Sequence, residues 1–335
     1  MGLDLRKNGL SVTLPALVIL FLLTGCGGGS SGSSSGMGNS SLSGNYRAGV
    51  IGVDATSSWT DLVDINFDGS GQFSGTSAGA GAITGTYSVQ SDGVFAADNE
   101  TGQVSQDGAL FHLVDTTTSD STMSIGIMEG SGMSAADLNG TYHVFFIRPV
   151  SGYDLMAERY SFVFDGAGNF TYTPFSAAAP PGATTYSVSG SGTLLTGYAD
   201  EGQVSANGDI FFFITGSYLA IGIRQTTGMS TADVTGTFHT ISLSDNDATD
   251  NIVDTISAWR ANFIADSTGN VAISFLDPTS PDDSGTITVN TNGAATTSGP
   301  VLGQISPDTG FFVMVDDDTL DMSNDYEMLI GILKP

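Results

Sequence analysis

The chain has 335 residues, of which 35 are Asp or Glu and only 8 are Lys or Arg, so its formal net charge is −27. A surface this acidic repels nucleic acid and anionic lipid headgroups, and neither is expected as a partner. The sequence contains one cysteine, which excludes an intrachain disulfide and leaves packing as the source of stability.

The first 25 residues are predicted to be a signal peptide. A short positive region precedes an apolar run over 10–23, which is too short to span a bilayer comfortably but has the length of a secretory signal. The run ends in Leu-Thr-Gly-Cys26, which resembles the lipobox of bacterial lipoproteins. The resemblance implies lipidation of Cys26 and attachment to a membrane, most simply the outer membrane, because Gly27 replaces the aspartate typical of inner-membrane retention. The alternative is an uncleaved anchor followed by a free cysteine.

A repeated motif divides the rest of the chain into three units. Met133-Ser-Ala-Ala-Asp-Leu-Asn-Gly-Thr-Tyr-His143 returns as Met229-Ser-Thr-Ala-Asp-Val-Thr-Gly-Thr-Phe-His239 and, more faintly, from Met37, so the methionines are 96 residues apart both times. A fixed period of this length indicates tandem structural repeats. We therefore predict a lipidated cysteine and glycine-serine tether over 26–41, followed by repeats over 42–132, 133–228 and 229–335.

Each repeat has the pattern of short antiparallel strands. Before Asp68 and Asp165, apolar residues alternate with polar ones, which places one face of the strand on a core. The turn that follows recurs at Asp266, and this repetition favours a backbone role for the aspartate over catalysis. Ser134-x-x-Asp137 predicts a single helical turn. In the second repeat the pattern gives eight strands, over 140–147, 158–164, 169–175, 184–189, 192–198, 202–206, 209–215 and 218–224.

The sequence therefore predicts an all-β protein of three tandem units, each a small eight-stranded barrel, because closure removes exposed strand edges. The order of helical turn, Gly-x-Tyr strand and Asp-Gly turn resembles the opening of bacterial lipocalin-like domains. Gly140-Thr-Tyr142, Gly236-Thr-Phe238 and Gly44-Asn-Tyr46 hold the signature position, without the tryptophan found in many members. The alternatives are a six-bladed propeller, because each repeat can be halved, and β-sandwiches.

One predicted strand breaks the alternation. The segment 209–215 is apolar on both faces, and so are its counterparts at 109–115 and 311–315. Such a strand is covered twice, and an apolar stripe left in water is rarely tolerated. We therefore predict that one of its faces is buried between repeats, making a rigid body. The pattern leaves open which face this is, and we expect serine in place of whichever of Phe211 and Phe213 lies outside to loosen the packing.

Few residues are candidates for chemistry. His143 and His239 occupy the same repeat position and are expected to face outward, whereas His112 lies in the doubly apolar strand and is expected to pack. Two acidic segments interrupt the third repeat, and their hard oxygen ligands could bind Ca²⁺, with a solvated acidic loop as the alternative. The candidate ligands are Asp245, Asp247, Asp250, Asp316, Asp318 and Asp321.

The sequence predicts a non-enzymatic module without a cofactor, because no serine stands in a Gly-x-Ser-x-Gly elbow between a strand and a helix. The module would bind, adhere or act as a scaffold at the cell envelope, with an unidentified protein, glycan or small apolar molecule as partner. The alternative is a lipocalin-like carrier of small apolar ligands. Because an eight-stranded barrel barely holds its own side chains, we expect a filled core. In the carrier, the residues lining or filling the interior of the barrel would be Tyr142, Phe146, Phe162 and Phe164. A secreted hydrolase is the third possibility.

Overall fold

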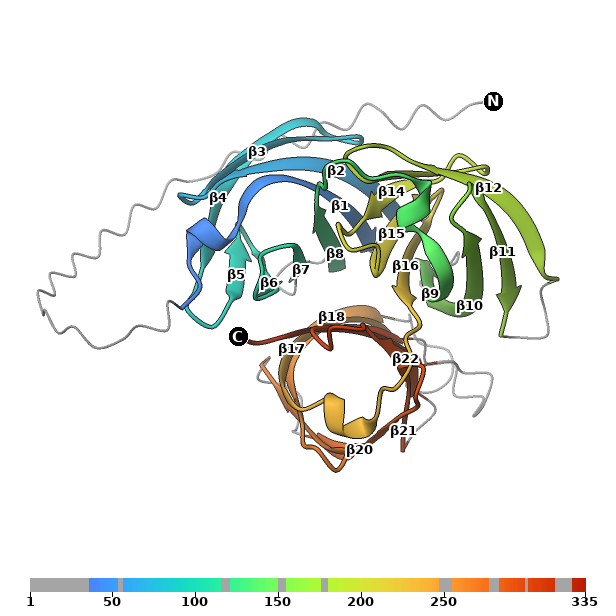
Figure 1. Ribbon diagram of the computed structural model, residues 1–335. Coiled ribbons are helices and arrows are strands. Elements are labelled where there is room, and N and C mark those ends of the chain that lie inside the picture. The colour runs from blue at the N-terminus through green and yellow to red at the C-terminus, as the bar shows by residue number, and fades with distance from the viewer. Residues whose placement is uncertain are drawn as a thin grey trace, which may run out of the picture. The chain divides into compact units, whose positions relative to one another are not determined.

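The computed structural model describes residues 36–53, 57–115, 121–149, 155–175, 180–246, 255–276, 283–298, 301–316 and 327–335. Over these residues the chain forms three closed barrels of eight antiparallel strands each (Figure 1). The prediction of tandem eight-stranded barrels is confirmed, and the propeller and sandwich alternatives are wrong. Within the described residues, no helix has the length and apolarity that a membrane crossing requires.

Strand bounds follow the repeats. Barrel 1 consists of β1 (Ser43–Val53), β2 (Ser58–Asp68), β3 (Gln72–Ser77), β4 (Gly81–Val89), β5 (Val94–Ala97), β6 (Glu100–Val104), β7 (Leu110–Asp115) and β8 (Ser121–Met128). Barrel 2 consists of β9 (Asn139–Pro149), β10 (Leu155–Asp165), β11 (Asn169–Pro174), β12 (Gly182–Val188), β13 (Thr193–Thr196), β14 (Glu201–Val204), β15 (Ile210–Thr215) and β16 (Tyr218–Arg224). Barrel 3 consists of β17 (Gly236–Asn246), β18 (Thr255–Ala265), β19 (Asn270–Phe275), β20 (Asp283–Val289), β21 (Ala294–Thr297), β22 (Val301–Ile305), β23 (Phe311–Asp316) and β24 (Glu327–Leu333). All eight strands predicted for the second repeat are present.

The aspartate turn joins the second and third strands of every barrel. In barrel 2, Oδ1 of Asp165 accepts hydrogen bonds from the backbone N–H groups of Ala167 and Asn169, at 2.7 and 2.9 Å. Asp68 and Asp266 make the same pair of bonds in their barrels. These bonds, with that from the Asn169 side chain the largest cause, lower the pKa of Asp165. The predicted backbone role is confirmed.

A short 3₁₀ turn closes one end of each barrel, and in barrels 2 and 3 it begins at the serine-aspartate spacing that predicts a helical turn. The three turns are followed by fully buried residues, and in barrel 2 the hydroxyl of Tyr186 lies 2.7 Å from the carbonyl oxygens of both Ala135 and Leu138. Tyr142 donates its hydroxyl proton to the carbonyl of Gly208 at 2.6 Å. We call this end the floor of the barrel. The turns are η1 (Asn39–Ser41), η2 (Ala135–Asp137) and η3 (Thr231–Asp233), and the buried residues are Leu42, Leu138 and Val234.

A buried glutamine explains the Gly-Gln motif that recurs in each repeat. Gln203 is completely buried, and its Nε2 donates to the carbonyl of Ser191 at 2.7 Å, which fixes the turn between β12 and β13. The residue before it must be glycine, because a Cβ on Gly202 would lie 1.8 Å from the carbonyl oxygen of Phe212. The same glutamine bond occurs in the other two barrels, so the motif serves folding.

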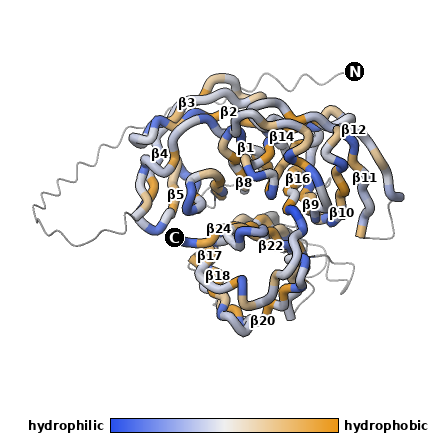
Figure 2. The backbone as a smooth tube through the Cα atoms, viewed as in Figure 1, coloured by the Kyte–Doolittle hydropathy of each residue, from blue (hydrophilic) through white to orange (hydrophobic). Residues whose placement is uncertain are grey.

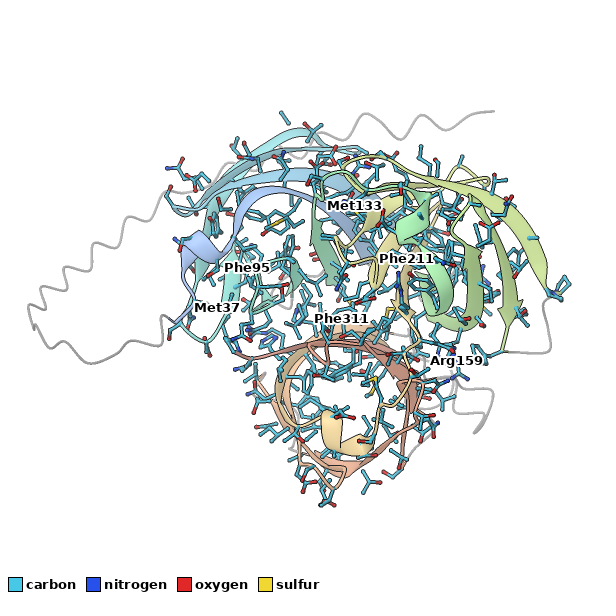
Figure 3. The ribbon with its side chains drawn as sticks, in the orientation of Figure 1. Met37, Phe95, Met133, Arg159, Phe211 and Phe311 are labelled. Carbon is cyan, nitrogen blue, oxygen red and sulfur yellow. The ribbon has the colours of Figure 1, made fainter. Side chains whose placement is uncertain are left out.

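Alternate residues of the strands fill each barrel, and apolar and polar positions follow one another along the tubes in Figure 2. Each barrel has its own cluster of buried side chains, with aromatic rings prominent in the first two. Phe95 belongs to the first of these cores and Phe211 to the second (Figure 3).

A further apolar cluster lies between the barrels and confirms that the doubly apolar strands are buried on both faces. It is built from the outward faces of β7, β15 and β23, together with their neighbours. The expectation that either Phe211 or Phe213 lies outside the barrel is wrong, because both face the core of their own barrel. The outward phenylalanine is Phe212, which is completely buried in the shared cluster. Its ring packs on Gly49 of barrel 1, where an added Cβ would come within 2.8 Å of ring carbons.

The three interfaces follow one rule. Strands β1 and β2 of barrel 1 contact β14–β16 of barrel 2, and β9 and β10 of barrel 2 contact β23 and β24 of barrel 3. Strands β17 and β18 of barrel 3 then contact β6–β8 of barrel 1. Each barrel thus offers its first hairpin to the last strands of the next, which is the head-to-tail contact that closes rings of identical subunits. A single chain here reproduces that arrangement.

Candidate functional site

The predicted calcium ligands are largely beyond the described residues. Asp247, Asp250, Asp318 and Asp321 lie outside them, as do the side chain of Asp245 and the predicted lipidation site Cys26. Asp316 ends β23 and pairs with Glu327 across the ladder. In the ranges that the structure covers, no group of three or more His, Cys, Asp or Glu could hold a metal ion. The calcium site stays a prediction.

The histidines lie between barrels. The rings of His112 and His239 stack with centroids 5.4 Å apart, and Nε2 of His112 is 3.0 Å from the carbonyl oxygen of His239. His143 packs edge-on against Phe175 and contacts Gln225. Burial lowers the pKa of His112 and of His143 to about 4, so both are neutral at pH 7. The predicted outward position of His143 and His239 and the packing role of His112 are confirmed.

A cavity of about 230 Å³ opens at the end of barrel 2 away from the floor. We call it the cup. Eight of its eleven lining residues are aromatic, and two of the others are carboxylates. The lining residues are Phe146, Glu158, Tyr160, Phe162, Phe170, Tyr172, Tyr198, Asp200, Phe213, Thr215 and Tyr218.

The strand period places these side chains. On β10, every second residue points into the barrel, so Glu158, Tyr160 and Phe162 descend from the mouth toward the floor. Strands β9, β11, β15 and β16 each contribute inward residues, and the turn between β13 and β14 adds Tyr198 and Asp200. The cup is therefore assembled from residues that are distant in sequence and meet only because the barrel closes.

Ring contacts hold the wall of the cup in place. Phe146 packs edge-on against Tyr160 at 5.1 Å and against Phe213 at 5.7 Å between centroids. Tyr172 meets Tyr198 edge-on at 6.5 Å, and their hydroxyl oxygens are 3.1 Å apart. Edge-to-face pairs at these separations add to the stabilisation from burial alone. The wall is a preformed aromatic surface, of which Tyr198 at 58% exposure is the outermost part.

Polar groups are few and fixed. Oε2 of Glu158 accepts a hydrogen bond from the hydroxyl of Tyr160 at 2.9 Å, and burial together with this carboxylate raises the pKa of Tyr160 to about 12. Asp200 is only 6% exposed, and its Oδ2 accepts a bond from Thr196 at 2.6 Å. Near the cup, the guanidinium of Arg148 lies 5.0 Å from the ring centroid of Tyr218.

Several corresponding positions of barrel 1 carry smaller residues. By strand register, Val50 stands for Phe146 and Val63 stands for Tyr160. Barrel 3 has a cavity of about 350 Å³ at this end, with a different lining that includes Trp259, Asp316 and Glu327. Sequence reasoning placed Phe146 and Phe162 in the interior but did not find the cup. The available signal was the set of Phe146, Tyr160 and Tyr172, whose equivalents are Val50, Val63 and Gly75 in barrel 1 and Ser242, Ala261 and Ile273 in barrel 3.

Comparisons with known proteins give no family. No family model matches the chain, and no curated protein does. Among solved structures, a mutant of transferrin binding protein B from Haemophilus parasuis Hp5 is 10% identical, with 87% of this chain and 75% of that chain covered and a TM-score of 0.30. The isotype 1 transferrin binding protein B from serogroup B Neisseria meningitidis is 11% identical over 88% and 77%, with the same TM-score of 0.30. Similarity at this level carries no argument about the function of this chain.

Proposed function

We propose that this chain is a non-enzymatic binding protein of the cell envelope, with the cup of barrel 2 as its ligand site. The observation that carries the proposal is a preformed aromatic cavity with two carboxylates at the mouth of a barrel. Concave apolar sites with a few fixed polar groups, including barrel mouths, are where proteins bind small molecules. The volume of about 230 Å³ is below the roughly 300–1,000 Å³ of pockets for drug-sized ligands, so the bound group is small.

A carrier that encloses an apolar ligand deep in the barrel has less support. Tyr142 and Phe211 are completely buried at the floor of barrel 2, and Phe164 packs between them with centroid distances of 5.3 and 5.5 Å. Rings fill the space that a deep ligand would need. A ligand would therefore rest at the mouth, in contact with solvent, as suits capture at a cell surface rather than enclosed transport.

The envelope location rests on the sequence motif that ends in Cys26. The folded body begins close after it, because the backbone N–H of Met37 already donates to the carbonyl of Ser91 at 3.2 Å. Replacement Cys26→Ser is expected to block lipidation and to leave an unprocessed precursor or a released protein. Fractionation and mass spectrometry of the N-terminus check this. A processed form of the variant that still sediments with membranes would show the anchoring proposal to be wrong.

The ligand site can be tested by filling the cup. Thr215 lines it, so Thr215→Trp places an indole in the cavity, whereas Thr173→Trp adds the same side chain to the exposed outer face of β11. Native mass spectrometry of protein purified from its host, or ligand-observed NMR with a fragment mixture, gives the readout. We expect the wild type and the Thr173→Trp control to bind and Thr215→Trp to lose binding. Equal binding by both variants would move the ligand site elsewhere.

A further inference from the structure

We propose that the cup takes a small organic cation, in particular a quaternary or methylated ammonium group. This inference deepens the proposed function and rests on it. The cup combines a wall of rings with two carboxylates, and barrel 1 lacks the same wall.

The wall presents rings from several sides of one small space. Phe146, Tyr160 and Tyr172 come from three different strands, and Tyr198 reaches over the mouth from the turn before β14. The negative face of an aromatic ring attracts a cation, and the attraction is stronger when water is excluded. Aromatic cages of this kind recognise quaternary ammonium groups.

The protein already places one cation against a ring of this wall. Cζ of Arg148 lies 5.0 Å from the centroid of Tyr218, within the distance at which the interaction is significant. Nη2 of Arg148 also lies 2.8 Å from Sδ of Met156, so the guanidinium is held at the rim by soft contacts. One ring of the lining therefore already makes a cation–π contact within the protein.

The charge of the lining has the matching sign. Glu158 lies on β10 and Asp200 directly precedes β14, and in the strand order of the barrel these two elements are on opposite sides. The lining residues include two carboxylates and no lysine or arginine. Hydrogen bonds in the described part of the chain engage Oε2 of Glu158 and Oδ2 of Asp200. A cation between them would have a carboxylate on either side.

The burial of Asp200 favours an organic cation as its partner. Asp200 is only 6% exposed, and a buried charge is costly unless it is paired. Electrostatic attraction also increases as water is excluded. A methylated ammonium combines positive charge with an apolar surface, so it satisfies the carboxylates and the rings together. A strongly hydrated metal ion would gain little from the rings.

Barrel 1 provides an internal control. By register, Glu100 stands where barrel 2 has Asp200, so the carboxylate is shared. The rings are not shared, because Val63 and Gly75 replace Tyr160 and Tyr172. This carboxylate therefore does not distinguish barrel 2 from barrel 1. The aromatic wall is the feature that does.

The test uses choline and its neutral carbon isostere, in which a quaternary carbon replaces the nitrogen. Titration of the tether-free body by calorimetry or ligand-observed NMR measures both affinities. We expect choline to bind at least about tenfold more tightly than the isostere, which corresponds to about 1.4 kcal/mol. The double variant Glu158→Gln, Asp200→Asn should lose this preference, while Glu100→Gln in barrel 1 should keep it.

The outcomes separate the two proposals. Equal binding of choline and its isostere in the cup would overturn the cation class and leave the cup as a binding site. Failure of choline to bind at millimolar concentration would also overturn the cation class. If, in addition, Thr215→Trp leaves the ligand from the host in place, the cup itself is not the site and the proposed function fails.

Discussion

Barrels 1 and 2 share their tyrosine contacts at the floor and differ at the mouth. At the floor, the hydroxyl of Tyr87 meets the carbonyl of Leu42, just as Tyr186 meets Leu138. Likewise, the hydroxyl of Tyr46 donates to the carbonyl of Gly108 in barrel 1, and the hydroxyl of Tyr142 donates to the carbonyl of Gly208 in barrel 2. At the mouth, barrel 1 carries valines and a glycine at the positions that are equivalent to phenylalanine and tyrosine in barrel 2.

The difference separates residues that fold the repeat from residues that give one repeat a task. The tyrosine contacts of the floor are present in both barrels and stabilise each unit in the same way. Arg224, which donates to the carbonyls of Asp137 and Gly208, is replaced by Met128 in barrel 1.

At the mouth, Phe162, Phe170 and Phe213 still belong to the core of barrel 2. Phe146, Tyr160 and Tyr172 pack against that core and line the cavity, and these are the positions that change between barrels 1 and 2.

The outward strand face between barrels is a third case, since it is mostly apolar but carries different residues in each copy, with His112 of barrel 1 at the position of Phe212 in barrel 2. Mutations in these three regions are expected to differ in their effect on stability, with the largest effect between barrels and the smallest at the mouth.

The largest effect is expected in the shared cluster between barrels. Phe212→Ser removes a completely buried ring and leaves a hydroxyl among apolar side chains, which should destabilise the body by about 4–6 kcal/mol. His112 occupies the equivalent position of barrel 1, and His112→Ser should cost less because fewer apolar atoms are lost. Urea unfolding measures both, with Val163→Ser on the exposed outer face of β10 as the neutral control.

Scattering by the same variants reports on the packing of the barrels. We expect Phe212→Ser to increase the radius of gyration below the unfolding transition, because the ring packs on Gly49 of barrel 1. A compact particle with wild-type stability would show that the cluster does not hold the barrels together. The Val163→Ser control should be indistinguishable from the wild type in both measurements.

Much of this fold could be predicted from the sequence, because the repeat multiplies weak signals. The turn aspartates, the Gly-Gln motif and the alternation before Asp165 all appear in register, and together they indicate closed antiparallel units. The side of the doubly apolar strand that faces outward could not be predicted. Phe211 and Phe212 lie on opposite faces of the strand and are both apolar, so alternation of polar and apolar residues cannot tell the inward face from the outward one.

The cup could be predicted only in part. Phe146 and Phe162 were placed inside the barrel by alternation, but the meeting of Glu158 with Asp200 depends on barrel closure across strands far apart in sequence. The contact between His112 and His239 depends in the same way on the cyclic order of the barrels. Local patterns specify strands and turns, whereas these pairs are set by packing between units.

The second prediction concerns acid. His112 has a pKa of about 4 in the folded protein because of its burial, against about 6.5 when exposed, so the unfolded state binds more protons between these values. Stability contributed by neutral His112 is therefore present above pH 6.5 and lost as the pH falls toward 4, on the order of 3 kcal/mol. His239 faces it, with Arg260 and Lys334 nearby, and its pKa is lowered in the same direction.

Replacing His112 with phenylalanine, the residue of barrel 2 at this position, isolates the effect. His112→Phe should remove this part of the loss between pH 6.5 and 4, as measured by urea midpoints along a pH series. Burial raises the pKa of Glu100 to about 7, and its contribution runs oppositely, being lost as the pH rises from about 4.5 to 7. Glu100→Gln serves as the control, because it should remove the opposite contribution and leave the loss due to His112 in place. An unchanged slope in His112→Phe would show that this histidine is not the acid-sensitive group.

The third prediction compares the two floors. Tyr87→Phe and Tyr186→Phe each remove a hydroxyl that contacts the carbonyl of the residue after the 3₁₀ turn, at 2.7 Å in both barrels. Each should cost about 1 kcal/mol, the usual net value of such a bond. Hydrogen exchange at the backbone amides of the turns gives the local readout. Effects that differ by more than a factor of three would contradict the view that the floors are equivalent.

The smallest effect on stability is expected at the rim of the cup, with Tyr198→Ala. The ring of Tyr198 is 58% exposed, so its loss should change the free energy of unfolding by less than about 0.5 kcal/mol. The hydroxyl of Tyr172 loses its partner at 3.1 Å but can bond water instead. Binding of choline should nevertheless weaken severalfold, because one face of the aromatic wall is gone. Leu195→Ala, another exposed residue of barrel 2, should alter neither quantity. A loss of stability without a loss of binding would assign Tyr198 to folding and reverse the distinction between mouth and floor.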